Sequence, residues 1–183
     1  QARMPPSREG VGREIDGVDY RFCRAETEEQ LEMAGTLVMR RYAWRGYDAE
    51  GALSSSAETG EVTYVAHSDE GVDGTLTVRI AGQTELLAEQ LYPAEIAELR
   101  RKHERLCEFG RLAFDEGINT LELLGPLFHL GMHLAQSRHG CSAMVIEVNP
   151  RHVGFYRRVF GFTVLGEERP CDRVAAPAVL LYL

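Results

Sequence analysis

The sequence lacks the features that mark membrane-spanning and nucleic-acid-binding proteins. Its longest apolar runs are far shorter than the roughly 20 residues that a transmembrane helix needs. Basic residues are in the minority, since 20 Lys and Arg stand against 28 Asp and Glu and give a formal net charge of −8. General nucleic-acid binding requires a basic surface instead. We therefore expect no integral membrane segment and no nucleic acid among the partners.

Cysteine is also scarce, with four residues in the chain: Cys23, Cys107, Cys141 and Cys171. No two of them have the C-x-x-C spacing of zinc sites and redox-active pairs. Their mostly apolar neighbours are typical of buried free thiols. The sequence therefore predicts no metal site, a reducing compartment and a cytoplasmic location.

What the sequence does contain is the composition of one globular domain. Apolar residues make up 44% and charged residues 26%, and a chain of 183 residues is long enough to bury a sizeable core. The N-terminal stretch is polar and rich in Pro, Gly and Arg, without the apolar core of a signal peptide. We expect residues 1–15 to be a disordered tail and residues 16–183 to form the domain.

The first half of the chain predicts strands and two helices. Residues 20–25 and the pair 62–67 and 75–80 alternate as strands do, and the pair should form a β-hairpin. Thr27 and Gln30 form a capping box that opens a helix, and Pro93 can begin the second one. The expected apolar positions are Leu31, Ala34, Val38 and Tyr42 on the first helix and Ile96, Leu99 and Leu106 on the second. Residues 52–60 should be a surface loop.

In the second half, strands alternate with helices. Residues 107–114 and 143–148 are strand-like, and residues 119–138 form a helix with an apolar stripe. A short helix starts at Asn149, and residues 162–165 and 178–183 are the last two strands. This alternation indicates an α/β fold with a mostly parallel sheet in this half and antiparallel neighbours from the first half.

The region of the short helix resembles the GNAT acyltransferases. Residues 149–156 read NPRHVGFY and are followed by Phe160-Gly161-Phe162, which is similar to the strand-helix-strand signature of that family. The resemblance implies the GNAT acyltransferase fold, a mixed antiparallel and parallel central sheet flanked by helices. It also implies a splayed pair of parallel strands, here residues 107–114 and 143–148, between which the thioester arm enters.

Two further stretches resemble bacterial N-acyl amino acid synthases. These are residues 166–178 near the C-terminus and the strand segment EFGRLA at residues 108–113, which also resembles the Glu-x-x-Arg element of acyl-homoserine-lactone synthases. The resemblance implies an N-acyltransferase that moves a long fatty acyl group from an acyl carrier protein thioester to the amine of an amino acid or similar small amine. The phosphopantetheine arm would arrive with the donor, and no other cofactor is implied.

One turn of the chain bears on whether the acyl donor is acyl carrier protein or coenzyme A. In ordinary acetyltransferases this turn holds the coenzyme A pyrophosphate. Its glycine-rich pattern is not recognisable in residues 114–119. Asp115 and Glu116 would repel a pyrophosphate there, which favours acyl carrier protein over coenzyme A. A coenzyme A-dependent N-acetyltransferase and a non-catalytic acyl-binding module of the same fold remain as alternatives.

Aminolysis of a thioester needs a deprotonated amine, donors for the oxyanion and a path for the thiolate. Glu108 is the candidate to bind the ammonium group or to accept its proton through water, and Arg111 could hold an acceptor carboxylate. Residues three apart in an ideal strand face opposite sides. The two share a face only if the strand bulges, which Gly110 permits. A purely structural Glu108–Arg111 ion pair is the alternative.

Tyr156 could protonate the leaving thiolate, although one extra residue before Gly161 favours a packing role in the core. Arg41 and Trp44 could close over the acceptor, or Trp44 and Tyr47 could simply pack at a helix end. Asn149 of the signature is also expected to bind substrate. An apolar slot for the acyl chain is expected to be lined by Leu112, Phe114, Leu124, Phe128 and Val148.

Two further groups have simpler alternatives. His129 and His133 stand one helical turn apart, a spacing that can bind zinc, but solvated or hydrogen-bonded histidines are the plainer interpretation. Basic clusters within residues 100–105 and 151–158 could dock an acidic carrier protein. They could equally be solvated helix faces with nearby glutamates.

Overall fold

The structure is a computed structural model that describes residues 10–46, 60–102 and 105–183. An eight-stranded sheet has the order β1-β2-β3-β4-β5-β6-β8-β7. The strands are β1 Gly10–Ile15, β2 Val18–Arg24, β3 Glu61–His67, β4 Val72–Ile80, β5 Leu106–Phe114, β6 Ala143–Val148, β7 Thr163–Cys171 and β8 Ala176–Tyr182. The helices are α1 Glu28–Trp44, α2 Ala88–Leu91, α3 Pro93–Lys102, α4 Thr120–His139, η3 Pro150–His152 and α5 Val153–Phe160.

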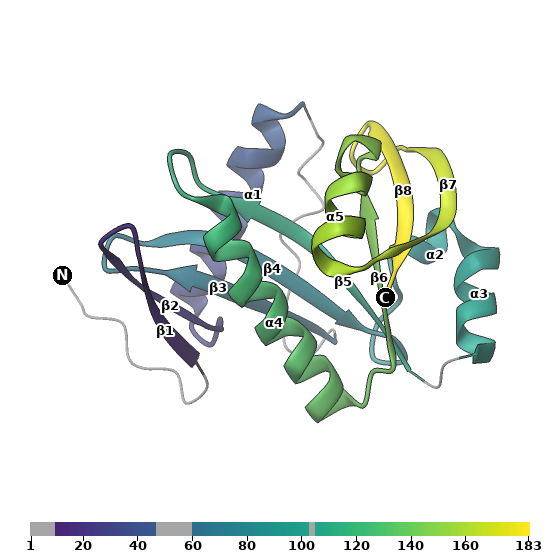
Figure 1. Cartoon of the computed structure of the whole chain (residues 1–183), viewed down its shortest axis with the longest axis horizontal. Coiled ribbons are helices and arrows are strands. Elements are labelled where there is room, and N and C mark those ends of the chain that lie inside the picture. Colours follow the sequence, from purple (N-terminus) through teal and green to yellow (C-terminus); the bar gives the residue numbers. More distant parts are fainter. Residues whose placement is uncertain (1–9, 47–59, 103–104) are drawn as a thin grey trace.

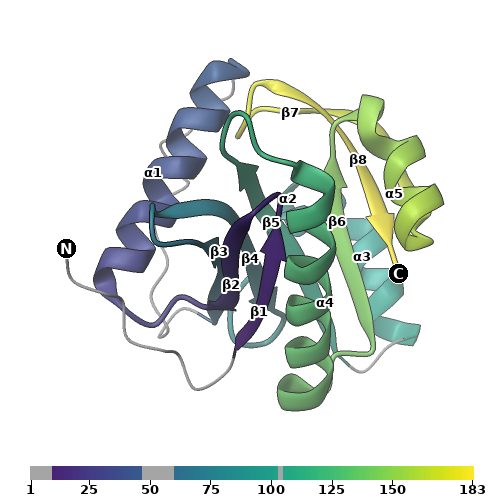
Figure 2. The same ribbon diagram turned by 60° about the vertical axis from the view of Figure 1, so that its left-hand side comes forward.

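Helices cover both faces of this sheet. In Figure 1, α4 crosses in front of the sheet and α1 lies behind it, and Figure 2 shows these two helices on opposite sides. α5 packs on the α4 face, where Tyr156 and Phe162 join the same core as Leu127 and Phe128. The other face is covered by α1 in one part and by α2 and α3 in another. The α/β fold with a mixed sheet flanked by helices is therefore confirmed.

The parallel part of the sheet is smaller than the sequence predicts. β5 and β6 are parallel, and the other pairs are antiparallel. The expectation of a mostly parallel second half is therefore wrong. The reason is the C-terminal β7–β8 hairpin, because its second strand inserts between β6 and β7 and runs antiparallel to both.

The N-terminal boundary also differs from the prediction. Residues 10–15 form β1, which pairs with β2 in register from Gly10↔Cys23 to Ile15↔Val18. Asp16 and Gly17 make the two-residue turn, with φ values of 52° and 80°, and Asp-Gly is a strong signal for such a hairpin. The part of the predicted tail from residue 10 onward is therefore wrong. Residues 1–9, Tyr47 and residues 52–59 of the predicted loop lie outside the described residues.

The predicted helix starts are present. The Thr27 side chain accepts a hydrogen bond from the Gln30 amide at 3.1 Å, and the Gln30 side-chain oxygen accepts one from the Thr27 amide at 3.2 Å. The prediction that Leu106 lies on the second helix is wrong, because α3 ends at Lys102 and Leu106 begins β5. It still packs in the same cluster as Ile96 and Leu99. The predicted burial with these two residues is therefore correct, although Leu106 lies on a strand.

Two features of the strands prepare the site. The pairing of β5 with β6 ends at Phe109↔Ile146, although both strands continue further, so the predicted splay is present. None of the helices in the described part of the chain is both long and apolar enough to cross a membrane.

Candidate active site

A cavity of about 930 Å³ lies where β5 and β6 separate. Its size falls within the range of small-molecule sites, about 300–1,000 Å³. Residues from both faces of the sheet line it, which means that it passes through the gap between the strands. The residues on the α4–α5 face include Leu124, Val148, Phe155 and Tyr156, and those on the α2 face include Glu61, Arg79, Glu108, Glu147 and Arg173.

A bulge in β5 brings Glu108 and Arg111 to one face. On β4, Thr75 pairs with Ala113 and Thr77 with Gly110, so β5 carries one extra residue. The residue in the left-handed region is Arg111, with φ of 48°, and not Gly110. This conformation is unfavourable for a side chain other than glycine. The predicted shared face is confirmed, because Arg111 contacts Glu61, which stands in one register row with Arg79 and Glu108 across three strands.

Glu108 and Arg111 have different partners from those predicted. Glu108 accepts hydrogen bonds from the amides of Leu87 at 2.6 Å and Ala88 at 3.0 Å. Arg111 lies 2.7 Å from Glu61. The prediction of convergence on one cavity is therefore correct, but the alternative of a direct Glu108–Arg111 ion pair is wrong, because each side chain is held by another element.

The buried environment of Glu108 raises the pKa of its carboxyl group. The side chain is 3% exposed, and burial raises its pKa to about 7, helped by the charge of Glu147. The Leu87 and Ala88 amides and the Arg79 guanidinium act in the opposite direction. A carboxyl group with this pKa exchanges between charged and neutral forms near neutral pH, which is the behaviour of a group suited to proton transfer.

A row of charges crosses three strands beside Glu108. Glu61 on β3 pairs with Arg79 on β4, and Arg79 pairs in turn with Glu108 on β5. Arg79 and Arg111 both form ion pairs with the buried Glu61. Two guanidinium groups thus share the carboxylate of Glu61 beside Glu108. Glu61 and Arg79 were not predicted as site residues, because their only signal in the sequence was a charge within otherwise apolar strands.

Two more charged residues in the cavity wall were also missed. Glu147 follows Ile146 on β6, and Arg173 lies in the turn between β7 and β8. They form an ion pair with each other. Glu147 is the one charged residue of an otherwise apolar strand, and this was its only signal in the sequence. Nothing in the sequence indicated that it pairs with Arg173.

Tyr156 is a core aromatic residue that also lines the cavity. Its ring lies 6.0 Å from that of Phe128 and 5.9 Å from that of Phe162. Burial raises the pKa of its hydroxyl above the ordinary value of 10.0. A hydroxyl that holds its proton this strongly is present as a donor at neutral pH. The predicted packing role is confirmed, and proton donation to a thiolate remains a prediction.

Most of the expected apolar lining is in place. Leu112, Phe114, Leu124 and Val148 line the cavity. Phe128 does not, and this part of the prediction is wrong. Its ring is buried one layer behind the wall, stacked on Phe160 at 4.6 Å and edge-to-face with Phe109 at 5.2 Å.

Of the residues expected to contact the acceptor, two line the cavity and one does not. Arg41 and Asn149 line the cavity. Trp44 does not, because its side chain is 69% exposed at the end of α1, where the Arg41 guanidinium lies 4.8 Å from the ring centre. Trp44 as a residue of the cavity wall is therefore wrong, although it holds Arg41 by a cation–π contact.

The acidic turn after β5 is neutralised. Asp115 lies 2.6 Å from Arg40, and Glu116 lies 2.6 Å from Arg41. The argument that these two carboxylates repel a pyrophosphate is therefore weaker than the sequence alone indicates, because α1 supplies a counter-charge to each.

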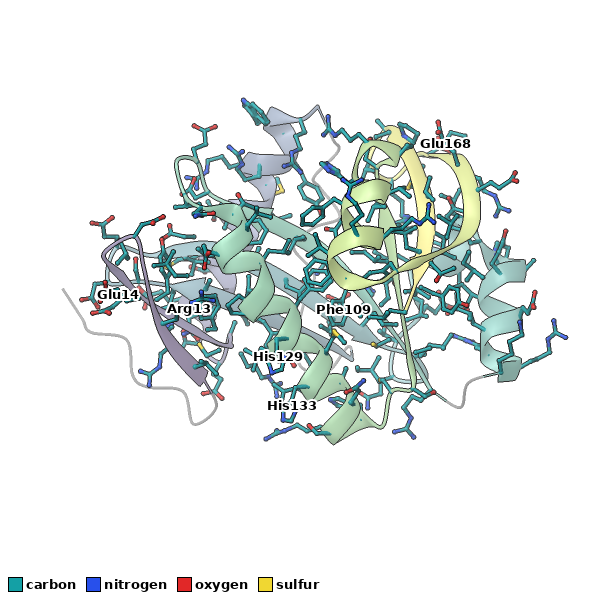
Figure 3. The ribbon with its side chains drawn as sticks, viewed as in Figure 1. Arg13, Glu14, Phe109, His129, His133 and Glu168 are labelled. Atoms are coloured by element: carbon teal, nitrogen blue, oxygen red, sulfur yellow. The ribbon has the colours of Figure 1, made fainter. Side chains whose placement is uncertain are left out.

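The remaining polar groups lie away from the cavity wall. Figure 3 shows His129 and His133 on the outer side of α4, with Phe109 behind the helix; the two imidazoles stack at 6.4 Å. Among the described residues, no three potential metal ligands come together. In the α3 cluster, Arg100 pairs with Glu89 and Lys102 with Glu98, as the solvated-face alternative predicts.

Comparisons with known proteins agree with this geometry. The family model described as N-acyl amino acid synthase FeeM matches residues 33–183. The structure of FeeM, an N-acyl amino acid synthase from uncultured soil microbes, aligns with a TM-score of 0.79 and 23% identity, covering 94% of this chain and 91% of that one. No curated protein sequence matches the chain.

More distant structures share the fold. An acyl-CoA N-acyltransferase from Pseudomonas aeruginosa aligns with a TM-score of 0.61 at 14% identity over 90% of this chain and 98% of that one. Escherichia coli ElaA aligns with a TM-score of 0.61 at 11% identity over 89% and 97%. The fold is that of the GNAT acyltransferases, and because the FeeM model matches most of the chain, the protein belongs to this family of N-acyl amino acid synthases and is an acyltransferase.

Proposed function

We propose that the protein moves a long fatty acyl group from an acyl carrier protein thioester to the amine of an amino acid or a similar small amine. The observation that carries the proposal is the cavity through the splayed strands. It offers apolar walls on the α4–α5 face and charged walls on the α2 face. An apolar acyl chain and a charged amine thus find suited surroundings on opposite sides of one gap.

The strand ends explain where the thioester would lie. β5 has no ladder partner on its β6 side beyond Phe109, so its backbone groups in that gap are available to a phosphopantetheine arm. The thioester carbonyl would then lie at the splay. Glu108 supplies negative charge for the ammonium group and a route for its proton through water, and Tyr156 gives a proton to the leaving thiolate.

The choice of donor rests on charge and chain length. The turn at residues 114–119 lacks the glycine-rich pattern that holds a pyrophosphate, and the ion pairs of Asp115 and Glu116 with α1 use Arg40 and Arg41 to neutralise these carboxylates and leave no surplus positive charge for coenzyme A. An apolar wall that extends across Leu112, Phe114 and Leu124 suits a long chain. Each methylene that is buried contributes about 0.8 kcal/mol, or about fourfold in affinity.

The test compares donors with the same acyl group. Tetradecanoyl-acyl carrier protein and tetradecanoyl-coenzyme A are each incubated with the protein and the twenty protein amino acids. Products are identified by mass spectrometry, and kcat/KM is measured for the best acceptor. We expect N-acyl amino acids and a higher kcat/KM with the carrier protein. An equal or higher value with coenzyme A would contradict the donor assignment, and absence of any N-acyl product would contradict the reaction.

A further inference from the structure

Glu147 and Arg173 form a charged pair at the point where the two strands separate. Glu147 is the first residue of β6 beyond the last one paired with β5. Arg173 comes from the turn that follows β7, and the antiparallel pairing of β8 with β6 brings that turn over the end of β6. Both side chains line the cavity, and Arg173 Nη2 donates to Glu147 Oε2. The pair therefore adjoins the proposed position of the thioester.

Strand alternation places Glu147 on the same face as Glu108. Val145 and Leu180, which pack with α2 and α3, are on the α2 face. Val145 is two residues before Glu147, and Leu180 is its register partner on β8. The charge of Glu147 is felt by Glu108, so the two carboxyl groups belong to one polar compartment.

One oxygen of Glu147 has no hydrogen-bond donor among the described residues. The side chain is 12% exposed, and Oε1 is a buried atom without a partner there. Buried carboxylate oxygens are almost always paired, because losing water without gaining a donor is unfavourable. An ammonium group would supply the missing donor. Glu108 is less suited to this contact, because the amides of Leu87 and Ala88 already bind both of its oxygens.

Arg173 supplies the complementary group. A guanidinium has five N–H donors in a planar fork, of which the contact with Glu147 uses one. An α-amino acid carries an ammonium and a carboxylate on the same carbon. A neighbouring carboxylate and guanidinium match these two charges side by side. A simple amine matches only the first.

We infer that Glu147 and Arg173 together bind the head group of an α-amino acid acceptor, with Glu147 Oε1 on the ammonium and Arg173 on the carboxylate. This assignment rests on the function proposed above and deepens it. Glu147 is then the group that touches the reacting nitrogen, and Glu108 acts behind it by adding negative charge. The competing carboxylate ligands Arg79 and Arg111 are held by Glu61, whereas Arg173 is held by Glu147 itself, beside its unpartnered oxygen.

The proton transfers balance for an ammonium substrate. One of its three protons passes to Glu147 and from there, through water beside Glu108, to solvent, which frees the nitrogen lone pair. The nitrogen forms the bond to the thioester carbon, and the carbon–sulfur bond breaks. A second proton ends on the thiolate sulfur, and the third remains on the amide nitrogen. The products are an N-acyl amino acid, a free thiol and one released proton.

The experiment compares the best amino acid acceptor with the amine obtained by removing its carboxylate. Arg173→Gln should raise KM for the amino acid by roughly 10- to 100-fold, as expected for loss of a charge-assisted bidentate contact. Its kcat/KM for the amine should fall by a clearly smaller factor, because that substrate has no carboxylate for the guanidinium and loses only the support that Arg173 gives to Glu147. Glu147→Gln should lower kcat/KM for both acceptors by about 100-fold, the usual scale for a proton-accepting group.

Arg169→Gln is the matched control. Arg169 lies on the same hairpin and pairs with Glu95 at 2.5 Å outside the cavity. If Glu147 and Arg173 only hold the hairpin in place, Arg173→Gln will behave like Arg169→Gln, with activity toward both acceptors falling in step with the melting temperature. That result overturns the inference. Arg173→Lys keeps the charge without the fork and should give an intermediate KM, which tests the same point in a second variant.

Calorimetric titration separates this inference from the proposed function. The wild-type protein is titrated with each of the twenty protein amino acids, and Arg173→Gln with those that bind. Loss of binding in the variant supports the clamp even if turnover with the chosen donor fails. Amino acids that are acylated by the wild type but bound equally by Arg173→Gln overturn the clamp and leave the proposed function standing. Failure of every amino acid to bind the wild type overturns the clamp directly.

Discussion

The two faces of the sheet surround one cavity with opposite chemistry. On the α4–α5 face the wall consists of side chains such as Leu124, Val148 and Phe155, whereas on the α2 face it carries Glu108 and Glu147. Neighbouring residues of one strand supply both, because successive side chains point to opposite faces. The sheet therefore separates an apolar compartment from a charged one, and the splay between β5 and β6 connects them.

This difference explains why the site can be built from ordinary strands. A buried carboxylate is unfavourable unless it is paired, and each carboxylate of the charged compartment has such a partner. Glu61 pairs with Arg79 and Arg111, Glu108 with two backbone amides, and Glu147 with Arg173. The apolar compartment needs no such partners. Its size and shape instead decide which chain fits, so the two compartments should respond to different substitutions.

The largest expected effect is on the apolar side. Leu124→Trp should fill part of the compartment and exclude the end of a long chain. Excluding five methylenes would lower kcat/KM for a tetradecanoyl donor by about 1,000-fold, at about fourfold for each methylene. A butanoyl donor should be affected little. Steady-state kinetics with donors of increasing length measures both effects.

A buried residue that is not in the wall provides the control. Leu127 lies on the same helix within the core and does not line the cavity. Leu127→Ala should lower the melting temperature and leave the order of preferred chain lengths unchanged. If Leu124→Trp reduced activity equally with short and long donors, the α4–α5 side would not be the acyl compartment.

On the charged side, Glu108→Gln should lower kcat/KM by roughly 100-fold through loss of the negative charge near the amine. The structure adds a cost in stability that the sequence did not predict. Gln has one acceptor oxygen, so either the Leu87 or the Ala88 amide loses its partner, at about 1–3 kcal/mol. Urea denaturation gives this cost separately from the kinetics. A folded variant with full activity would remove Glu108 from the mechanism.

The pH dependence of stability offers a smaller and independent test of the charged compartment. Below the ordinary pKa of 4.5, Glu108 is protonated in the folded and the unfolded chain. Between this value and the folded pKa of about 7, only the unfolded chain releases the proton. Stability should therefore fall as pH rises through this window, by up to about 1.4 kcal/mol per pH unit, and level off above it.

Comparison with Glu108→Gln isolates this contribution. The difference in unfolding free energy between wild type and variant, measured in urea at several pH values, should carry the slope. Groups that do not interact with Glu108 contribute equally to both proteins and cancel in this difference, whereas Arg79 and Glu147 interact with the charge of Glu108 and remain part of its contribution. A difference that does not change between pH 5 and pH 7 would mean that the carboxyl group titrates normally in the folded protein.

The sequence predicted most of the elements because local patterns control them. The capping box of α1 and the signature at Asn149 depend on residues within a few positions. The Asp16-Gly17 turn was equally local and was overlooked. The fold as a whole followed from the resemblance, whereas the antiparallel β7–β8 insertion required the pairing of distant strands.

The site was harder to predict because its contacts connect distant elements. Glu108 and Arg111 were recognised, and the bulge that unites them was expected. Their partners were not, because Glu61 is 50 residues from Arg111 and the Leu87 amide is 21 residues from Glu108. Alternation along one strand predicts which face a residue takes. It does not predict which loop or neighbouring strand supplies the counter-charge.

The smallest expected effect tests from which face the donor approaches. If the acyl compartment on the α4–α5 face receives the chain, the carrier protein should dock near α5, where Arg157 and Arg158 are exposed. Reversing both charges to Glu should raise KM for the carrier-bound donor by roughly 10-fold through weaker electrostatic attraction. The melting temperature should change little, since exposed charges contribute little to stability.

The matched control reverses Arg100 and Arg101 on α3, which covers the opposite face. That variant should keep the wild-type KM for the carrier, and the α5 effect should shrink as salt is added, because screening weakens attraction between exposed charges. If reversing the α3 charges raised the KM for the carrier more than reversing the α5 charges did, the carrier would dock on the charged face. The assignment of the acyl chain to the α4–α5 face would then be wrong.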